Sequence, residues 1–196
     1  MKALQVVGRK KSGKTGLVVR LVPLLQARGL RVGTVKHSSH PHPLDREGSD
    51  SWLHRRSGAE ATLAITAAAA TLHFGLPESE ENIQALVERH LGHLDLVIIE
   101  GWSEREGPKI EVIPADKEGR PREPRHLESG ELLAVVLGPH LRASAESLAQ
   151  WKLELRAGGP EAKASAGHIP AFLWEDAQAV AELVLAWWRT DSWRRS

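Results

Sequence analysis

The chain has 196 residues, with 26 lysines and arginines against 25 aspartates and glutamates, so its formal net charge is +1. This balance argues against a general nucleic-acid binder and a membrane-surface binder, because both classes need a predominantly basic face. The absence of cysteine excludes disulfide bonds and thiolate metal sites. The short apolar start resembles neither a secretory signal nor a membrane span, so we expect a cytoplasmic protein without a nucleic-acid or membrane partner.

The composition also bears on habitat. Asn82 is the only asparagine and Met1 the only methionine. Depletion of thermolabile residues is typical of heat-adapted proteins, so we expect a thermophilic source. A GC-rich genome would favour a similar composition, and this second explanation stays open.

Apolar runs bounded by glycine, proline or polar residues predict strands along the chain. They cover residues 3–7, 31–36, 61–66, 70–74, 94–101, 109–113, 132–138 and 169–173. The run LDLVIIEG (94–101) is apolar on both faces, which predicts a central strand of a parallel sheet.

Segments with apolar residues at helical spacing alternate with these runs. They predict helices over residues 14–28, 49–56, 78–91, 148–155 and 180–187. Gly29 is expected to cap the end of the first helix, and Ser49 or Asp50 the start of the second. Pro23 removes one backbone hydrogen bond near Val19, which predicts a bend there.

The segment GRKKSGKT (8–15) matches the phosphate-loop pattern G-x-x-x-x-G-K-[ST] at every specified position. Gly8 and Gly13 allow the backbone to curve so that successive N–H groups point at phosphates. Lys14 is expected to reach the β- and γ-phosphates, and the Thr15 hydroxyl to hold Mg²⁺. Because a strand precedes the loop and an amphipathic helix follows it, we predict a nucleotide site. The predicted nucleotide-binding residues are Gly8, Arg9, Lys10, Lys11, Ser12, Gly13, Lys14, Thr15 and Gly16.

Strands that alternate with helices around such a loop predict an α/β fold of the P-loop NTPase type, with a mostly parallel central sheet flanked by helices. We expect one nucleotide-binding domain over residues 1–196, with residues 114–130 and 139–168 as loop insertions.

A carboxylate at the end of a neighbouring strand commonly helps to hold Mg²⁺ in P-loop proteins. Asp95 and Glu100 are the first and last residues of the run 95–100. A strand of this length places them roughly 16 Å apart. They therefore cannot share one site. Since phosphate binds at the carboxyl ends of the strands, Glu100 is the predicted metal residue and Asp95 a strand-entry residue.

Residues 36–51 follow the second predicted strand, where switch-like loops occur in P-loop proteins. Asp45 and Asp50 are candidates to approach Mg²⁺ or the γ-phosphate, although Asp50 suits helix capping equally well. The three histidines of this loop could form a transition-metal site, but ordinary polar loop residues are the better interpretation. These histidines are His37, His40 and His42.

Base preference cannot be predicted, because the chain lacks the Asn-Lys-x-Asp motif common in guanine-binding GTPases. No glutamine or arginine finger stands out, although Arg46, Arg55 and Arg56 are candidates. Intrinsic hydrolysis is therefore expected to be slow. Seven tryptophans exceed what a core of this size needs, which suggests an interface. Trp102 is the one whose position suggests a site.

Several segments in the same order resemble a known family, the molybdopterin-guanine dinucleotide biosynthesis protein B family (MobB). They are GRKKSGKT (8–15), TVKH (34–37), D-x-x-G-x-D-S (45–51), RRSGA (55–59), DLVIIEGW (95–102) and PKIEV (108–112). The resemblance covers roughly residues 1–115, with a weaker match in IPAFLWED (169–176). Gly16, where the family more often has threonine, and the long segment 139–168 depart from the family pattern.

The resemblance implies a GTP-binding accessory factor, usually a homodimer, that assists the guanylyltransferase joining GMP to molybdopterin. Molybdopterin or a molybdoenzyme is a further implied partner. By motif position, residues 8–15 would bind phosphates, while Asp50 and Glu100 would line the metal side. Lys109 would belong to a dimer-proximal or substrate-proximal region.

Two other functions stay open. A metallochaperone-type GTPase would load a metal through His37, His40 and His42. A P-loop small-molecule kinase would use residues 114–130 as a lid over its acceptor. The sequence predicts at most a weak GTPase, and mainly a GTP-binding accessory factor.

Overall fold

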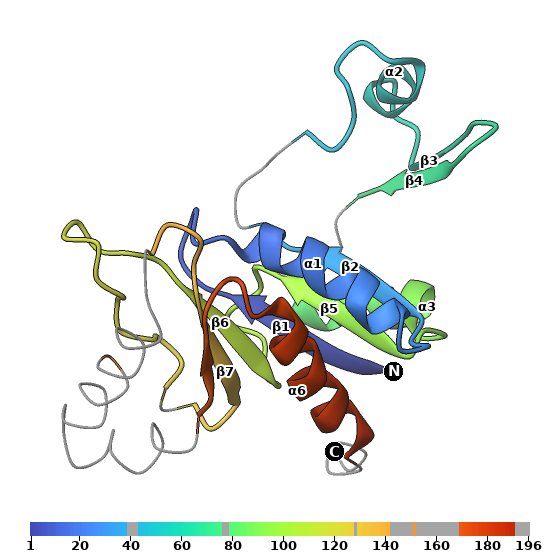
Figure 1. Ribbon diagram of the computed structural model, residues 1–196. Coiled ribbons are helices and arrows are strands. Elements are labelled where there is room, and N and C mark those ends of the chain that lie inside the picture. Colours follow the sequence, from blue (N-terminus) through green and yellow to red (C-terminus); the bar gives the residue numbers. More distant parts are fainter. Residues whose placement is uncertain (39–42, 76–78, 128, 142–150, 152–168, 191–196) are drawn as a thin grey trace. The chain divides into compact units, whose positions relative to one another are not determined.

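The computed structural model describes residues 1–38, 43–75, 79–127, 129–141, 151 and 169–190. The chain divides into two compact units, one formed by Met1–His37 with Leu91–Ser196 and the other by Ser38–His90 (Figure 1).

The first unit contains a parallel sheet of six strands. These are β1 (Lys2–Val7), β2 (Val32–Lys36), β5 (Leu96–Glu100), β6 (Lys109–Ile113), β7 (Leu132–Leu137) and β8 (Ala171–Phe172). Their order is β2-β5-β1-β6-β7-β8, and all neighbouring strands are parallel. The predicted fold class is therefore confirmed, and β5 is the fully buried strand between β1 and β2 that its sequence predicts.

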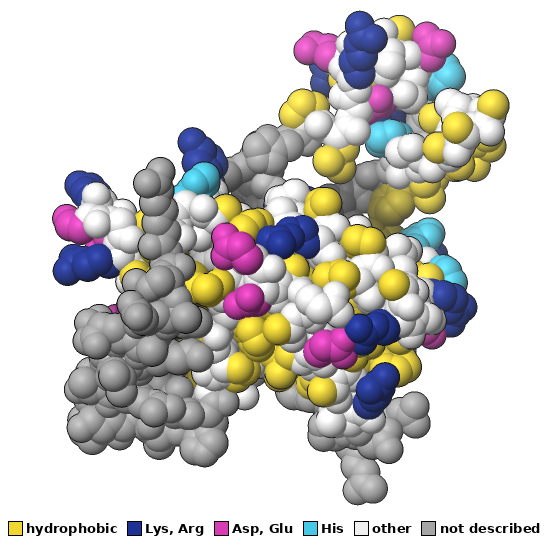
Figure 2. All heavy atoms as spheres, viewed as in Figure 1, with side chains coloured by type: hydrophobic (Ala, Val, Ile, Leu, Met, Phe, Trp, Pro, Cys, Tyr) yellow, Lys and Arg dark blue, Asp and Glu magenta, His cyan; other side chains and the backbone are white. Residues whose placement is uncertain are grey.

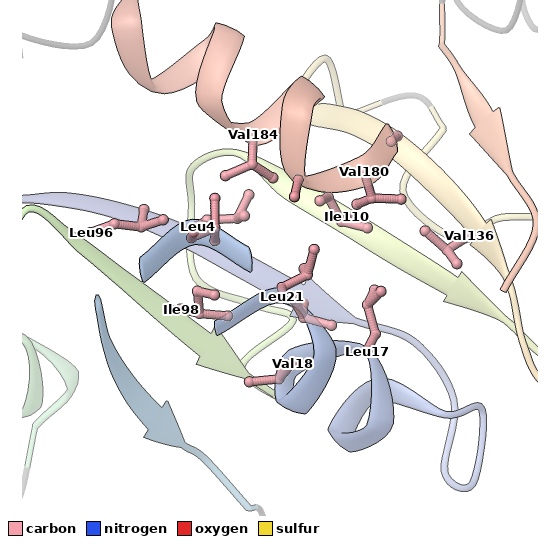
Figure 3. Close-up of a cluster of buried hydrophobic side chains, with 14 of the residues drawn as sticks. Leu4, Leu17, Val18, Leu21, Leu96, Ile98, Ile110, Val136, Val180 and Val184 are labelled. Atoms are coloured by element: carbon pink, nitrogen blue, oxygen red, sulfur yellow. The ribbon is translucent and has the colours of Figure 1, made fainter. Parts of the chain in front are cut away.

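Two helices, α1 (Lys14–Gln26) and α6 (Ala177–Arg189), pack against each other and against one face of this sheet. Leu17 and Leu21 of α1 meet Val180 and Val184 of α6 in this core (Figure 3), and Leu25 belongs to the same cluster. Burial of each such side chain contributes about 1.5–3 kcal/mol. A second cluster on β6, β7 and β8 extends the core.

A glycine lies at each end of α1, Gly13 before it and Gly29 after it. Gly13 precedes the helix with φ 107°. At the other end, the N–H of Leu30 donates to the carbonyl of Leu25 (3.3 Å) and that of Gly29 to Gln26 (2.9 Å). This pair of bonds is a Schellman motif with Gly29 in the left-handed conformation, which confirms its capping role.

Asp95 lies at the amino end of β5, at the opposite end from Glu100, as predicted. Its carboxylate accepts hydrogen bonds from the backbone N–H and the guanidinium of Arg31 (2.8–3.1 Å). These hydrogen bonds lower the pKa of Asp95 to about 2. Asp95 thus joins the entries of β2 and β5 and has a structural role.

The second unit contains α2 (Asp50–Arg56), the antiparallel hairpin of β3 (Ala61–Ile65) and β4 (Ala70–Phe74), and α3 (Glu80–Leu91), which ends just beyond the unit's boundary. Ser49 caps α2, because its hydroxyl accepts from the N–H of Trp52 (3.3 Å). Of the two predicted caps, Ser49 is therefore the observed one.

The hairpin has one covered and one exposed face. Thr62 of β3 is buried and His73 of β4 is half-buried, while α2 packs against β3. The side chains on the other face are all apolar and all exposed. We call this set the hairpin face: Ala61, Leu63, Ile65, Ala70, Leu72 and Phe74.

The helix predicted over residues 148–155 falls almost entirely outside the described residues, as does most of the insertion predicted over 139–168. Residues 114–130 contain a single isolated bridge, between Ala115 and Pro121, within their described part. None of the helices in the described ranges is long and apolar enough to cross a membrane.

Candidate nucleotide site

The loop between β1 and α1 depends on two glycines. Gly8 (φ 136°) and Gly13 (φ 107°) have backbone conformations that other residues rarely adopt. A Cβ atom on Gly8 would overlap the carbonyl oxygen of Val112, and one on Gly13 would lie 2.6 Å from Cδ of Pro139. The loop can therefore keep this shape only with glycine at both positions.

The residues between these glycines differ in exposure. Arg9, Lys10 and Lys11 are exposed, whereas Ser12 is 1% exposed. The hydroxyl of Ser12 is buried and has no hydrogen-bond partner among the described residues. An unpaired buried hydroxyl is costly, so this atom is suited to a polar ligand in the loop.

The Lys14 side chain folds back over the loop. Its ammonium group donates to the carbonyls of Gly8 (3.0 Å) and Arg9 (2.7 Å). Burial lowers the pKa of Lys14, and the Glu100 carboxylate opposes that shift. The ammonium is thus held beside the loop by weak neutral acceptors that a phosphate oxygen could replace.

Thr15 and Lys36 converge on one carboxylate oxygen of Glu100. The Thr15 hydroxyl donates to Oε1 of Glu100 at 2.7 Å, and the Lys36 ammonium pairs with the same oxygen. Glu100 is 6% exposed, so a charge here needs a partner. A hydroxyl and a carboxylate within hydrogen-bond distance are oxygen ligands of the kind that Mg²⁺ prefers.

The strand register explains this convergence. Glu100 is paired with Val6 of β1 and with Lys36 of β2, all at the carboxyl edge of the sheet. The phosphate loop begins two residues after Val6. The last residue of β5 therefore lies beside the phosphate loop and the end of β2.

The third predicted metal residue, Asp50, belongs to the other unit. It is the exposed first residue of α2. Asp45, in the same unit, accepts from the Ser49 hydroxyl (3.1 Å) and pairs with Arg55 (3.5 Å). The structure thus brings Thr15 and Glu100 together and leaves the predicted contribution of Asp50 to the metal a prediction.

The predicted histidine site is only partly described. His37 stacks on Trp102, with ring centroids 4.9 Å apart and planes at 14°, while His40 and His42 lie outside the described residues. His37 Nδ1 and Trp102 Nε1 are buried, and neither has a hydrogen-bond partner in the described part of the chain. Within those same ranges, no group of three or more potential metal ligands is present.

Lys109 is a buried lysine that is hydrogen-bonded and ion-paired within the first unit. It is 2% exposed, donates to the carbonyls of Arg105 (2.8 Å) and Gly107 (3.2 Å), and pairs with Glu131. The buried amide of Gln5 also donates to the Arg105 carbonyl (2.8 Å). These bonds fasten the segment that follows Glu100 to β1 and β6.

Four residues near the loop were not predicted as part of the site. Lys36 pairs with Glu100, and Gly138, Pro139 and Trp174 lie against the loop itself. A Cβ on Gly138 would overlap the carbonyl oxygen of Ser12. The only signal for Gly138 is a Gly-Pro pair after a strong strand, and it does not reveal which segment that strand approaches.

This parallel α/β sheet carries a phosphate loop between its first strand and a helix, and a carboxylate at the end of the adjacent strand, which together define the P-loop NTPase class of fold. The sequence profile of the family described as molybdopterin guanine dinucleotide synthesis protein B (MobB) matches residues 3–137. The chain belongs to this family.

Two curated relatives carry the name molybdopterin-guanine dinucleotide biosynthesis adapter protein. The Escherichia coli (strain K12) protein is 36% identical over 114 residues, which are 57% of this chain and 65% of that protein. The Haemophilus influenzae protein is 35% identical over 109 residues, which are 55% of this chain and 60% of that protein. The match thus spans less than two thirds of the length of both relatives.

Solved structures agree in fold. A crystal structure of molybdopterin-guanine biosynthesis protein B (mobB) has a TM-score of 0.63 and 27% identity, covering 96% of this chain and 99% of that one. Bacillus subtilis MobB also gives a TM-score of 0.63, at 21% identity and with 95% and 97% coverage. At 21% identity the likeness shows the fold alone.

We predict that Gly138→Ala destabilises the protein through the phosphate loop. The added Cβ would meet backbone atoms of Ser12 and, at 3.1 Å, the carbonyl oxygen of Ile113, so a segment must shift. Such overpacking costs about 1–3 kcal/mol, measurable by urea unfolding. Gly75→Ala is the matched control, because nothing lies within 4 Å of its Cβ. Equal stability of the two variants would contradict the packing described here.

Proposed function

We propose that the protein binds GTP with Mg²⁺ and acts as an accessory factor for the guanylyltransferase that completes molybdopterin guanine dinucleotide. The observation that carries nucleotide binding is the phosphate loop beside the Thr15–Glu100 hydrogen bond (2.7 Å). Family membership and the adapter names of the relatives support the accessory role.

The chain's own groups suit the phosphates in three ways. The first backbone N–H groups of a helix lack partners within the helix and carry the positive end of its dipole, so those at the start of α1 suit an anion. The Lys14 ammonium exchanges its two loop carbonyls for phosphate oxygens. When bound, Mg²⁺ would neutralise phosphate charge, with Thr15 and Glu100 as the residues that hold it.

We expect this protein to hydrolyse GTP slowly, if it hydrolyses GTP at all. Rapid phosphoryl transfer needs a positioned water or an arginine finger in addition to a phosphate cradle. The arginine candidates of the sequence, Arg46, Arg55 and Arg56, belong to the second unit. A protein that holds GTP without consuming it quickly suits a carrier or switch that serves a partner enzyme.

We also propose that the protein is a homodimer that associates through the hairpin face. Ile65 is 71% exposed and Leu63 58% exposed, and Phe74 and Leu72 extend the same apolar surface. Figure 2 shows hydrophobic side chains gathered over β3 and β4. Apolar residues exposed together on one face of a small sheet are typical of an interface.

The accessory role predicts that this protein raises cofactor yield when GTP is limiting. The assay combines purified guanylyltransferase, molybdopterin and GTP, with and without the protein. Wild type should increase product, and Lys14→Ala should not, because loss of the charge-assisted contacts lowers GTP affinity by about ten-fold or more. Lys117→Ala, which removes an exposed lysine outside the phosphate loop, is the control. If yield does not change at any GTP concentration, the metallochaperone function through His37, His40 and His42 becomes the leading candidate.

We predict that substitutions of Glu100 and Asp95, which lie at opposite ends of β5, affect Mg²⁺-dependent GTP binding differently. Glu100→Gln should weaken Mg²⁺-dependent GTP binding by about ten-fold or more, because the remaining amide is a poor partner for a cation. Asp95→Asn is the control, since Asp95 pairs with Arg31 at the other sheet edge. Isothermal calorimetry with and without Mg²⁺ measures both variants. Equal losses would place the metal elsewhere.

If the hairpin face is the dimer interface, lysine substitutions on this face should make the protein monomeric. The double variant Leu63→Lys/Ile65→Lys should be monomeric by light scattering at micromolar concentration, because burying two ammonium groups against apolar surface is unfavourable. Val19→Lys is the control, since Val19 is a 65% exposed apolar residue on α1 of the other unit. A monomeric wild-type protein, or a double variant that remains dimeric, would contradict this interface.

A further inference from the structure

The indole ring of Trp174 lies against the phosphate loop. An ideal Cβ on Gly16 would be 2.9 Å from Cζ2 of Trp174, and one on Gly13 would be 3.1 Å from Cζ3. The six-membered edge of the indole therefore covers two glycines at the start of α1. Any larger side chain at either position would push the ring away.

Several contacts hold Trp174 in this place. The guanidinium of Arg20 lies over the ring, 5.5 Å from its centroid, and donates to the carbonyls of Trp174 and Glu175. Arg20 is one helical turn beyond Gly16, so α1 itself supports the ring. Trp174 is half-buried, which leaves part of the indole open to solvent beside the loop.

The ring follows β8, on the side of β1 opposite to β5, the strand that carries Glu100. In this motif the lysine serves the β- and γ-phosphates and the following hydroxyl holds their metal, so Lys14 and Thr15 define that end of the ligand. Gly16 is the next residue of α1, and it contacts Trp174. A ligand that continues past the α-phosphate on this side meets Trp174.

We propose that Trp174 is a binding residue that forms an aromatic wall for the nucleoside part of the triphosphate. This inference rests on the proposed nucleotide function. A flat, rigid indole offers stacking surface to any base at little entropic cost. Trp174 lies outside residues 3–137, the range matched by the family profile, so this chain would supply the wall from its C-terminal segment.

The test compares GTP with inorganic tripolyphosphate, which carries the phosphates without the nucleoside. With Mg²⁺ and isothermal calorimetry, Trp174→Leu should weaken GTP by about ten-fold and tripolyphosphate by less than two-fold. Leucine preserves apolar packing against the core. Trp188→Leu is the control for loss of an indole, because Trp188 is half-buried on α6 and donates to the Asp95 carbonyl at the opposite sheet edge.

A second variant moves the ring without removing it. Gly16→Ala keeps the loop N–H but displaces the indole, so it should also weaken GTP selectively, and it should add little in the Trp174→Leu background. Equal losses of GTP and tripolyphosphate in Trp174→Leu would show that the ring only supports the loop and would overturn the inference alone. Failure of the wild-type protein to bind either ligand would overturn the proposed function and this inference with it.

Discussion

The carboxylate of Glu100 is the contact on which the arrangement of the site depends. It accepts the Thr15 hydroxyl and pairs with Lys36, so it joins the start of α1, the end of β2 and the end of β5. Parallel pairing makes this possible, because strands that run in one direction end at one edge. A nearly buried carboxylate that lacked either partner would be unfavourable, so the three segments stabilise one another.

A second set of contacts shapes the loop from the C-terminal half of the chain. Pro139 and Gly138 follow β7 and Trp174 follows β8, and all three lie against the loop or the first turn of α1. Strands β7 and β8 are on the side of β1 opposite to β5. The loop is therefore enclosed by charged residues from one side of the sheet and by apolar residues from the other, a division that suits a ligand with a phosphate end and an aromatic end.

The two units differ in how they bury apolar surface. The first has a continuous core between its sheet and helices, with Leu4, Leu21 and Ile98 fully buried. The second contains the helices α2 and α3 and a hairpin, which has α2 packed against β3 and leaves one apolar face exposed. Two strands rarely bury enough apolar area to be stable alone, so the proposed interface would add to the burial of this hairpin.

The sequence by itself determined the phosphate loop, the strands and helices of the described chain, and the placement of Asp95 and Glu100 at opposite ends of β5. These features depend on local spacing or on the direction of one strand, and both can be read without knowing which segments meet. Only the tertiary structure decided that Lys36, Gly138 and Trp174 join the loop, because their positions depend on strand order and register across distant segments. It also decided that the hairpin forms a separate unit, since the same alternating pattern predicts a strand whether its partner is a large sheet or a single neighbour.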